Sequence, residues 1–146
     1  MALAKALSAV VVGVDAQLVE AEANVGAGLP GTFIVGLADT AIAESRDRMK
    51  TAALNSGLSW PKTKVIVSLT PASLRKSGSQ LDLAMCLAIL SAAAEDYAMR
   101  AWLRSTMLLG EVGLDGGLRE VRGVLPALLA AKAAGLSTVV LPLANA

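Results

Sequence analysis

The chain has 146 residues, of which 55% are apolar and 3% aromatic, and its 13 basic and 12 acidic side chains leave a formal net charge of +1. That length suffices for one domain with an aliphatic core. The balanced charge excludes a polybasic tail that would bind nucleic acid or membrane through charge alone. The chain has no histidine, which excludes a Ser-His-Asp triad, a Cys-His dyad and the usual zinc sites.

Cysteine usage and hydropathy indicate the compartment. Cys86 is the one cysteine and lies in an apolar run, so we expect a small buried hydrophobe rather than a nucleophile. With no second cysteine, no disulfide forms within the chain, which fits a reducing compartment. The start of the chain lacks the features of a signal peptide, and the longest apolar run, residues 83–94, is too short to span a bilayer. We expect a cytoplasmic protein with no membrane partner.

The first third of the chain has the pattern of strands. Residues 5–12 predict a first strand, and 17–25 alternates two sets of side chains, as a strand with one wet face does. Gly13-Val14-Asp15 between them predicts a hairpin turn. The glycine-rich loop 26–31 then leads to a short strand at 33–35.

A helix is predicted next. Asp39 or Thr40 can cap it, it runs to about Asn55, and Gly57 stops it. The side chains expected on its buried stripe are Ile42, Met49 and Ala53. Glu44 and Arg48, four residues apart, form a supporting pair on its outer surface.

The centre of the chain combines a strand at 64–69, a polar loop, and a nearly continuous apolar helix that Asp82 opens. A loop at the carboxyl end of a strand is a common place for a functional site. We expect this loop to be an exposed, flexible turn whose serines cap the following helix, which Glu95 and Asp96 end.

After that helix we expect an amphipathic segment at 97–103 and short strands at 106–109 and 117–120, with a turn at 114–117 between them. A further helix is expected to start near Gly123 and Pro126 and to contain Leu125, Leu128, Leu129 and Ala131. A last strand is expected at 138–141. Together these elements predict one α+β domain over residues 1–146, with helices packed on a mixed β-sheet.

Few chemistries fit these residues. The glycine loop 26–31 precedes a strand and lacks the dinucleotide fingerprint, and the chain contains no phosphate-binding P-loop motif. Nucleophilic catalysis without histidine needs a Ser-Lys dyad, for which Ser79 and Lys76 share one loop. The lysine would have to be desolvated, whereas the loop is predicted to be exposed. Glu111 and Asp115 are expected to be capping and turn residues, and we expect no metal site.

Several motifs together resemble a known family. They are Gly28-Leu29-Pro30, Ile34–Leu37, Glu44–Arg48, Leu54–Gly57, Leu81–Ala84, Leu109–Val112, Leu118–Pro126 and Leu141–Ala146. In this order they resemble the N-terminal domain of ComM/YifB-type proteins, the magnesium-chelatase-like AAA+ ATPases. The resemblance covers nearly the whole chain.

The resemblance implies a fold like the proteolytic domain of Lon protease, also described as ribosomal protein domain-2-like. Ala84-Met85-Cys86 matches the helix that follows the catalytic serine in Lon. The serine position then falls on Gln80 and the catalytic lysine position on Ala127. Neither residue can perform its part of the dyad chemistry, so the resemblance implies a non-catalytic domain.

For the family, the resemblance implies ATP-driven work on DNA, such as branch migration during natural transformation. ATP and magnesium would bind an AAA+ module outside this segment. Expected partners are that module, a homo-oligomeric (hexameric) ring, and branched or single-stranded DNA. The side chains expected to contact DNA or a partner are Arg46, Arg48, Lys50, Arg75 and Lys76.

Two alternatives remain open. The first is a Lon-like, ATP-dependent peptidase in which Ser79 attacks and Lys76 takes the proton. The second is an accessory role in tetrapyrrole chelation, for which the few aromatics and absent axial ligands give no support.

Overall fold

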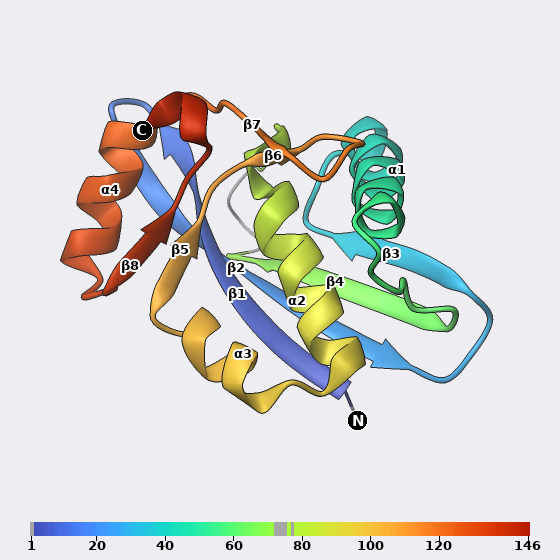
Figure 1. The fold of residues 1–146 in the computed structure, drawn as a ribbon. Coiled ribbons are helices and arrows are strands. Elements are labelled where there is room, and N and C mark those ends of the chain that lie inside the picture. The colour runs from blue at the N-terminus through green and yellow to red at the C-terminus, as the bar shows by residue number, and fades with distance from the viewer. Residues whose placement is uncertain (1, 72–75, 77) are drawn as a thin grey trace.

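A computed structural model of the chain describes residues 2–71, 76 and 78–146. Its main sheet has six strands in the order β3-β4-β2-β1-β5-β8 (Figure 1). These strands are β1 (Ala2–Val12), β2 (Asp15–Gly26), β3 (Gly31–Val35), β4 (Lys64–Thr70), β5 (Thr106–Leu108) and β8 (Thr138–Val140). A separate two-stranded sheet contains β6 (Glu111–Val112) and β7 (Leu118–Arg119). The helices are α1 (Asp39–Asn55), α2 (Asp82–Ala94), α3 (Tyr97–Leu103) and α4 (Val124–Ala133), with short 3-10 turns η1 (Ser79–Leu81) and η2 (Leu143–Asn145).

The main sheet is mixed, which confirms the predicted α+β class. β1 and β2 form a long antiparallel hairpin, and β4 pairs antiparallel with β2. β3 runs parallel to β4, and β5 runs parallel to both β1 and β8. The two strands predicted around the turn at 114–117 do not pair with each other: β5 joins the main sheet, while β7 pairs with β6.

The two faces of the sheet carry two cores. Val19, Ala21 and Ala23 of β2 face the main core, where α2 contributes Met85 and Ile89. The opposite face carries a smaller core around Met107 of β5, to which α4 contributes Ala127 and Ala131. Away from α4 this second face is partly exposed, for example at Phe33 and Ile66. The predicted strand with one buried face is therefore confirmed for β2.

Two predicted helix caps are wrong. Ala38 occupies the N-cap position of α1, and Asp39 is its first helical residue. Leu81 is the N-cap of α2, because η1 leads directly into that helix and leaves no extended residue for a serine cap. Asp82 is the first residue of α2, as predicted.

The β6–β7 hairpin leaves the main sheet and reaches the end of α1. Its turn is closed by the Gly113 amide on the Gly117 carbonyl at 2.8 Å, and Asp115 Oδ1 accepts from the Gly117 amide at 2.9 Å. Asn55 at the end of α1 donates to the Leu114 carbonyl at 2.8 Å. Asp115 is thus a turn residue, as expected.

Within the described part of the chain, none of the helices has the length and apolar composition that crossing a membrane requires.

Candidate functional site

A buried carboxylate joins three elements at the start of α2. Asp82 is fully buried, and its Oδ2 accepts from Arg48 Nε at 2.7 Å and from the Val112 amide at 3.2 Å. Its Oδ1 accepts from Arg48 Nη2 at 3.0 Å and from Ser45 Oγ at 2.9 Å. Both oxygens therefore have two donors, which offsets the desolvation cost of a buried carboxylate.

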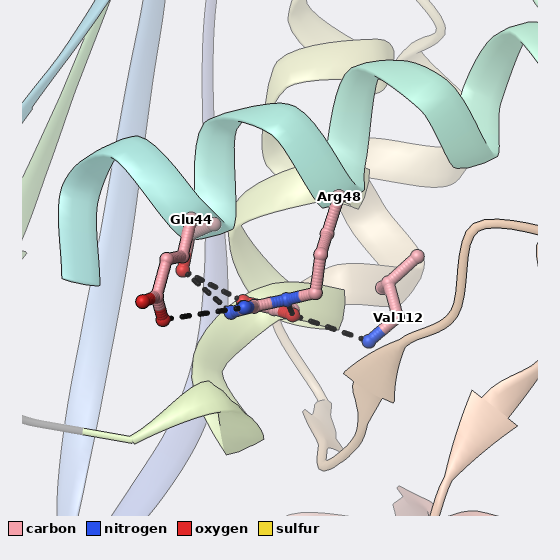
Figure 2. Close-up of polar contacts among 5 residues, drawn as sticks. Glu44, Arg48 and Val112 are labelled. Atoms are coloured by element: carbon pink, nitrogen blue, oxygen red, sulfur yellow. Dashed lines mark hydrogen bonds and ion pairs between the residues drawn. The ribbon is translucent and has the colours of Figure 1, made fainter.

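Figure 2 shows how this network is placed between the elements. The Arg48 guanidinium reaches from α1 toward the carboxylate, with Glu44 on one side and the backbone nitrogen of Val112 in β6 on the other. Glu44 is 3.9 Å from Arg48, which confirms the predicted pair, but its side chain is 73% exposed. The hydrogen bond to Asp82 raises the pKa of Arg48, so the guanidinium stays charged. The network positions α1 and the β6–β7 hairpin against α2.

Sequence reasoning missed the role of Asp82. The available signal was one acidic residue between Leu81 and Leu83, at the start of an otherwise apolar helix. A charge in such a run is buried, so it needs a basic partner elsewhere in the chain. Arg48 could not have been selected as that partner over the other arginines without the packing of α1 on α2.

The outer surface of α1 carries Arg46 and Lys50, two of the five side chains predicted to contact DNA or a partner. Arg46 and Lys50 each lie two residues from Arg48, about 200° around the helix, and therefore point away from Asp82. Both side chains are exposed and line a groove of about 500 Å³ together with Lys62. We call this the α1 groove. Its further lining residues are Asp47, Leu54, Trp60, Pro61, Pro30, Gly31 and Thr32.

The α1 groove combines positive charge with an apolar floor. Arg46, Lys50 and Lys62 outnumber Asp47, the one acidic residue among the lining residues. Trp60 is 8% exposed and belongs to the main core, so it provides a rigid wall. Such a groove attracts an anionic chain, since three exposed cations can each contact a phosphate or carboxylate. Lys62 was not among the predicted contacts.

The two expected dyad positions, Gln80 and Ala127, have different surroundings in the structure. Ser79 and Gln80 line a cleft whose other wall is formed by residues 120–122. Ala127 is 4% exposed and lies in the smaller core, not in the lining of that cleft. The backbone carbonyl oxygen of Gln80 accepts a hydrogen bond from the backbone amide of Gly110 at 3.2 Å.

Lys76 contradicts the expectation of an exposed loop. It is 2% exposed and donates a hydrogen bond to the Pro71 carbonyl. Burial lowers the pKa of the Lys76 amine. The long apolar stem of a lysine side chain can be buried, so the polar composition of the loop did not predict the exposure of Lys76 correctly. Arg75, the remaining predicted contact, lies outside the described residues.

Two observations bear on the binding of phosphate and of metal ions by the described residues. The loop 26–31 joins β2 to β3, so no helix N-terminus follows its glycines to receive a phosphate. Among residues 2–71, 76 and 78–146, no three histidine, cysteine, aspartate or glutamate side chains gather as a metal site would require.

Comparison with known proteins identifies related chains. Residues 21–145 match the family described as subunit ChlI of Mg-chelatase. An uncharacterized protein of Mycobacterium tuberculosis is 50% identical over 145 residues, which cover 99% of this chain and 28% of that protein. Competence protein ComM of Haemophilus influenzae is 38% identical over 132 residues, or 90% of this chain and 26% of that protein. The uncharacterized protein YifB of Escherichia coli is 37% identical over 128 residues, or 88% of this chain and 25% of that protein.

The chain therefore spans 25% to 28% of the length of these relatives. The matched region includes α1, the α1 groove and the Asp82 network.

Proposed function

Because the chain belongs to the family of Mg-chelatase subunit ChlI, we propose that it is a non-catalytic accessory domain of a magnesium-chelatase-like ATPase. In this proposal the rest of a protein of the relatives' length binds ATP and Mg²⁺ and forms a homo-oligomeric ring in the cytoplasm. The segment described here supplies a contact to DNA during ATP-driven DNA processing. Similarity to a competence protein supports a role in DNA uptake.

The observation that carries the proposal is the α1 groove. Arg46, Lys50 and Lys62 are exposed cations on one side of the molecule, while the net charge of the chain is only +1. A local cluster on a nearly neutral protein directs an anionic strand to one surface rather than to the whole molecule. Phosphate contacts of this kind position a strand without reading its sequence.

Two of the five side chains predicted to contact DNA or a partner are already engaged inside the domain. Arg48 has its guanidinium on the buried Asp82, and Lys76 is buried against the Pro71 carbonyl. We therefore assign these two residues to the architecture of the domain and propose Arg46, Lys50 and Lys62 as the DNA contacts.

The test replaces three cations by alanine in a protein of full natural length: Arg46→Ala, Lys50→Ala and Lys62→Ala together. Binding of fluorescent single-stranded and branched DNA is then measured by anisotropy at several salt concentrations. We expect weaker binding and a salt dependence flatter by about 2 units of log K per log salt, because each lost phosphate contact removes about 0.7 to 0.9 of a unit.

The matched control removes three exposed cations elsewhere, Lys5, Arg104 and Arg119, with the same change in net charge. We expect the control to bind nearly as the unmodified protein does. Equal losses in both triple variants would show a general charge effect and contradict a DNA site in the α1 groove.

A second candidate function is a Ser-Lys peptidase, and one observation favours it. A lysine acts as a general base only when its amine is partly neutral near pH 7, and burial moves the pKa of Lys76 in that direction. Ser79 lies three residues away and lines a cleft of about 720 Å³.

A fluorophosphonate probe distinguishes the two functions. A peptidase would be labelled, and Ser79→Ala and Lys76→Met would each abolish labelling. For an accessory domain we expect no labelling above that of the Ser79→Ala protein.

A further inference from the structure

Helix α4 presents its large side chains outward. Its inner face uses Ala127 and Ala131, which pack in the smaller core. Its outer face carries Leu125 at 66%, Leu128 at 37% and Leu129 at 60% exposure. A surface helix normally turns its bulky apolar residues toward the core and its polar residues to water. The arrangement here is the reverse, and it leaves the leucines without a covering surface.

The exposed surface continues beyond α4. Val12 and Val14, at the tip of the β1–β2 hairpin, are 48% and 88% exposed, and Leu143 in η2 is 90% exposed. Figure 1 shows the hairpin tip, the start of α4 and η2 at the same end of the molecule. We call these six residues the α4 patch.

Direct contacts join these three segments. A side chain on Gly123, the N-cap of α4, would meet Val11 of the hairpin. Asn145 donates to the Val121 carbonyl at 3.0 Å and accepts from the Val121 amide at 2.9 Å. These contacts hold the hairpin, the residues at the start of α4 and η2 next to one another, so the six residues of the α4 patch lie on one defined scaffold.

The chemistry of the α4 patch specifies an apolar partner. Lys132 is the one charged residue within α4. A group of exposed apolar side chains held at one end of a protein in water marks a contact with another protein surface, whose centre is depleted of charge.

Two observations identify the occupant. The chain spans only 25% to 28% of the length of its relatives. In addition, Asn145 is bonded directly beside the start of α4, so any residues that follow Ala146 in a longer protein begin next to the patch. A partner surface on the same polypeptide is present at high effective concentration, so it outcompetes a second copy from solution.

We propose that the α4 patch is the docking surface for the remainder of the same polypeptide in a protein of the relatives' length. The proposal rests on the accessory role proposed above and adds the surface through which that role is coupled to the rest of the protein. The α1 groove is not part of the patch, so DNA contact and docking use different residues.

The test measures the alkylation rate of single cysteines in the 146-residue chain and in the full-length protein, by mass spectrometry of the peptide that carries each cysteine. Leu129→Cys and Val14→Cys report on the patch, and Leu29→Cys, 86% exposed in the β2–β3 loop, is the control. Cys86 adds no background, because burial and the nearby Asp82 raise the pKa of its thiol to about 12.

We expect both patch cysteines to react quickly in the 146-residue chain and at least tenfold more slowly in the full-length protein, while Leu29→Cys reacts at the same rate in both. Equal patch rates in the two proteins would overturn the proposal. Slow patch rates in the 146-residue chain that rise on dilution would also overturn it, because a second copy would then be the occupant. DNA binding through the α1 groove is measured separately, so a failure of docking leaves the proposed function standing.

Discussion

At the scale of single residues, the Asp82 network determines where α1 lies. A carboxylate at zero exposure is tolerated because two donors reach each oxygen, one from the backbone of β6 and three from side chains of α1. Removing the negative charge of Asp82 leaves the Arg48 guanidinium partly buried without its main partner. The resulting loss of folding free energy is larger than the net stabilisation that the intact ion pair provides.

We predict that Asp82→Asn lowers the free energy of unfolding by about 3 kcal/mol, because one partner of a buried ion pair is lost. Urea denaturation at pH 7 measures this change. The control, Glu44→Gln, removes an exposed carboxylate 3.9 Å from the same guanidinium and should cost less than about 1 kcal/mol. Similar costs for the two variants would contradict the central position of Asp82.

Cys86 makes stability depend on alkaline pH. Burial, with a smaller contribution from Asp82, raises the pKa of its thiol from 9.0 to about 12. Between these values the unfolded chain loses the thiol proton and the folded chain keeps it. The stabilisation is therefore fully present below pH 9 and is lost as pH rises toward 12.

Relative to Cys86→Ala, we predict that the unmodified chain loses on the order of 2 kcal/mol of unfolding free energy between pH 8 and pH 10.5. Lys76 opposes this trend in both proteins, since its lowered pKa makes stability rise over part of the same range. Comparing the two proteins cancels that contribution. Identical pH profiles would show that the Cys86 thiol ionises freely.

At the scale of elements, the turn after β3 places α1. Gly36 has φ of +100°, and a Cβ there would lie 2.8 Å from the Leu69 carbonyl oxygen of β4. Both the backbone conformation and the close approach of the two strands therefore require glycine.

We predict that Gly36→Ala destabilises the fold by about 3 kcal/mol, whereas Gly57→Ala costs about 1 kcal/mol. Gly57 has a similar positive φ of +76° but open space around its Cβ position, so it isolates the backbone contribution. Thermal unfolding followed by circular dichroism compares the two. Equal losses would mean that the strands separate to admit the methyl group.

Elements whose signal lies within a few residues were predictable. The alternation in β2, the glycine in the β1–β2 turn and the glycines on either side of α1 specify those elements locally. The pairing of β6 with β7 was missed because strands of two residues carry almost no periodic signal. Likewise, the sequence contains the leucines of α4, but only the packing of α4 through its alanines shows that they face outward.

The candidate site was predictable in part. The sequence placed Arg46 and Lys50 among its contact candidates together with Arg48, and it could not separate them from Arg48, which turns to Asp82. Lys62 joins them across 12 residues of chain only through the fold. The burial of Lys76 and the pairing of Arg48 with Asp82 depend equally on long-range packing.

At the scale of the whole molecule, two surfaces lie toward different edges of the main sheet. The α1 groove includes Gly31 and Thr32 of β3, the strand at one edge. The core beneath α4 includes Val139 of β8, the strand at the other edge. This separation allows one molecule to hold a nucleic-acid strand while it packs against the remainder of a longer protein.

The most direct measurement of the central claim is lysine footprinting on the unmodified full-length protein. Acetylation of individual lysines is followed by mass spectrometry with and without single-stranded DNA. We predict that DNA slows the acetylation of Lys50 and Lys62, while exposed Lys5 on β1, outside the α1 groove and the α4 patch, reacts at an unchanged rate. Protection of Lys5 with Lys50 and Lys62 unprotected would contradict a DNA contact in the α1 groove.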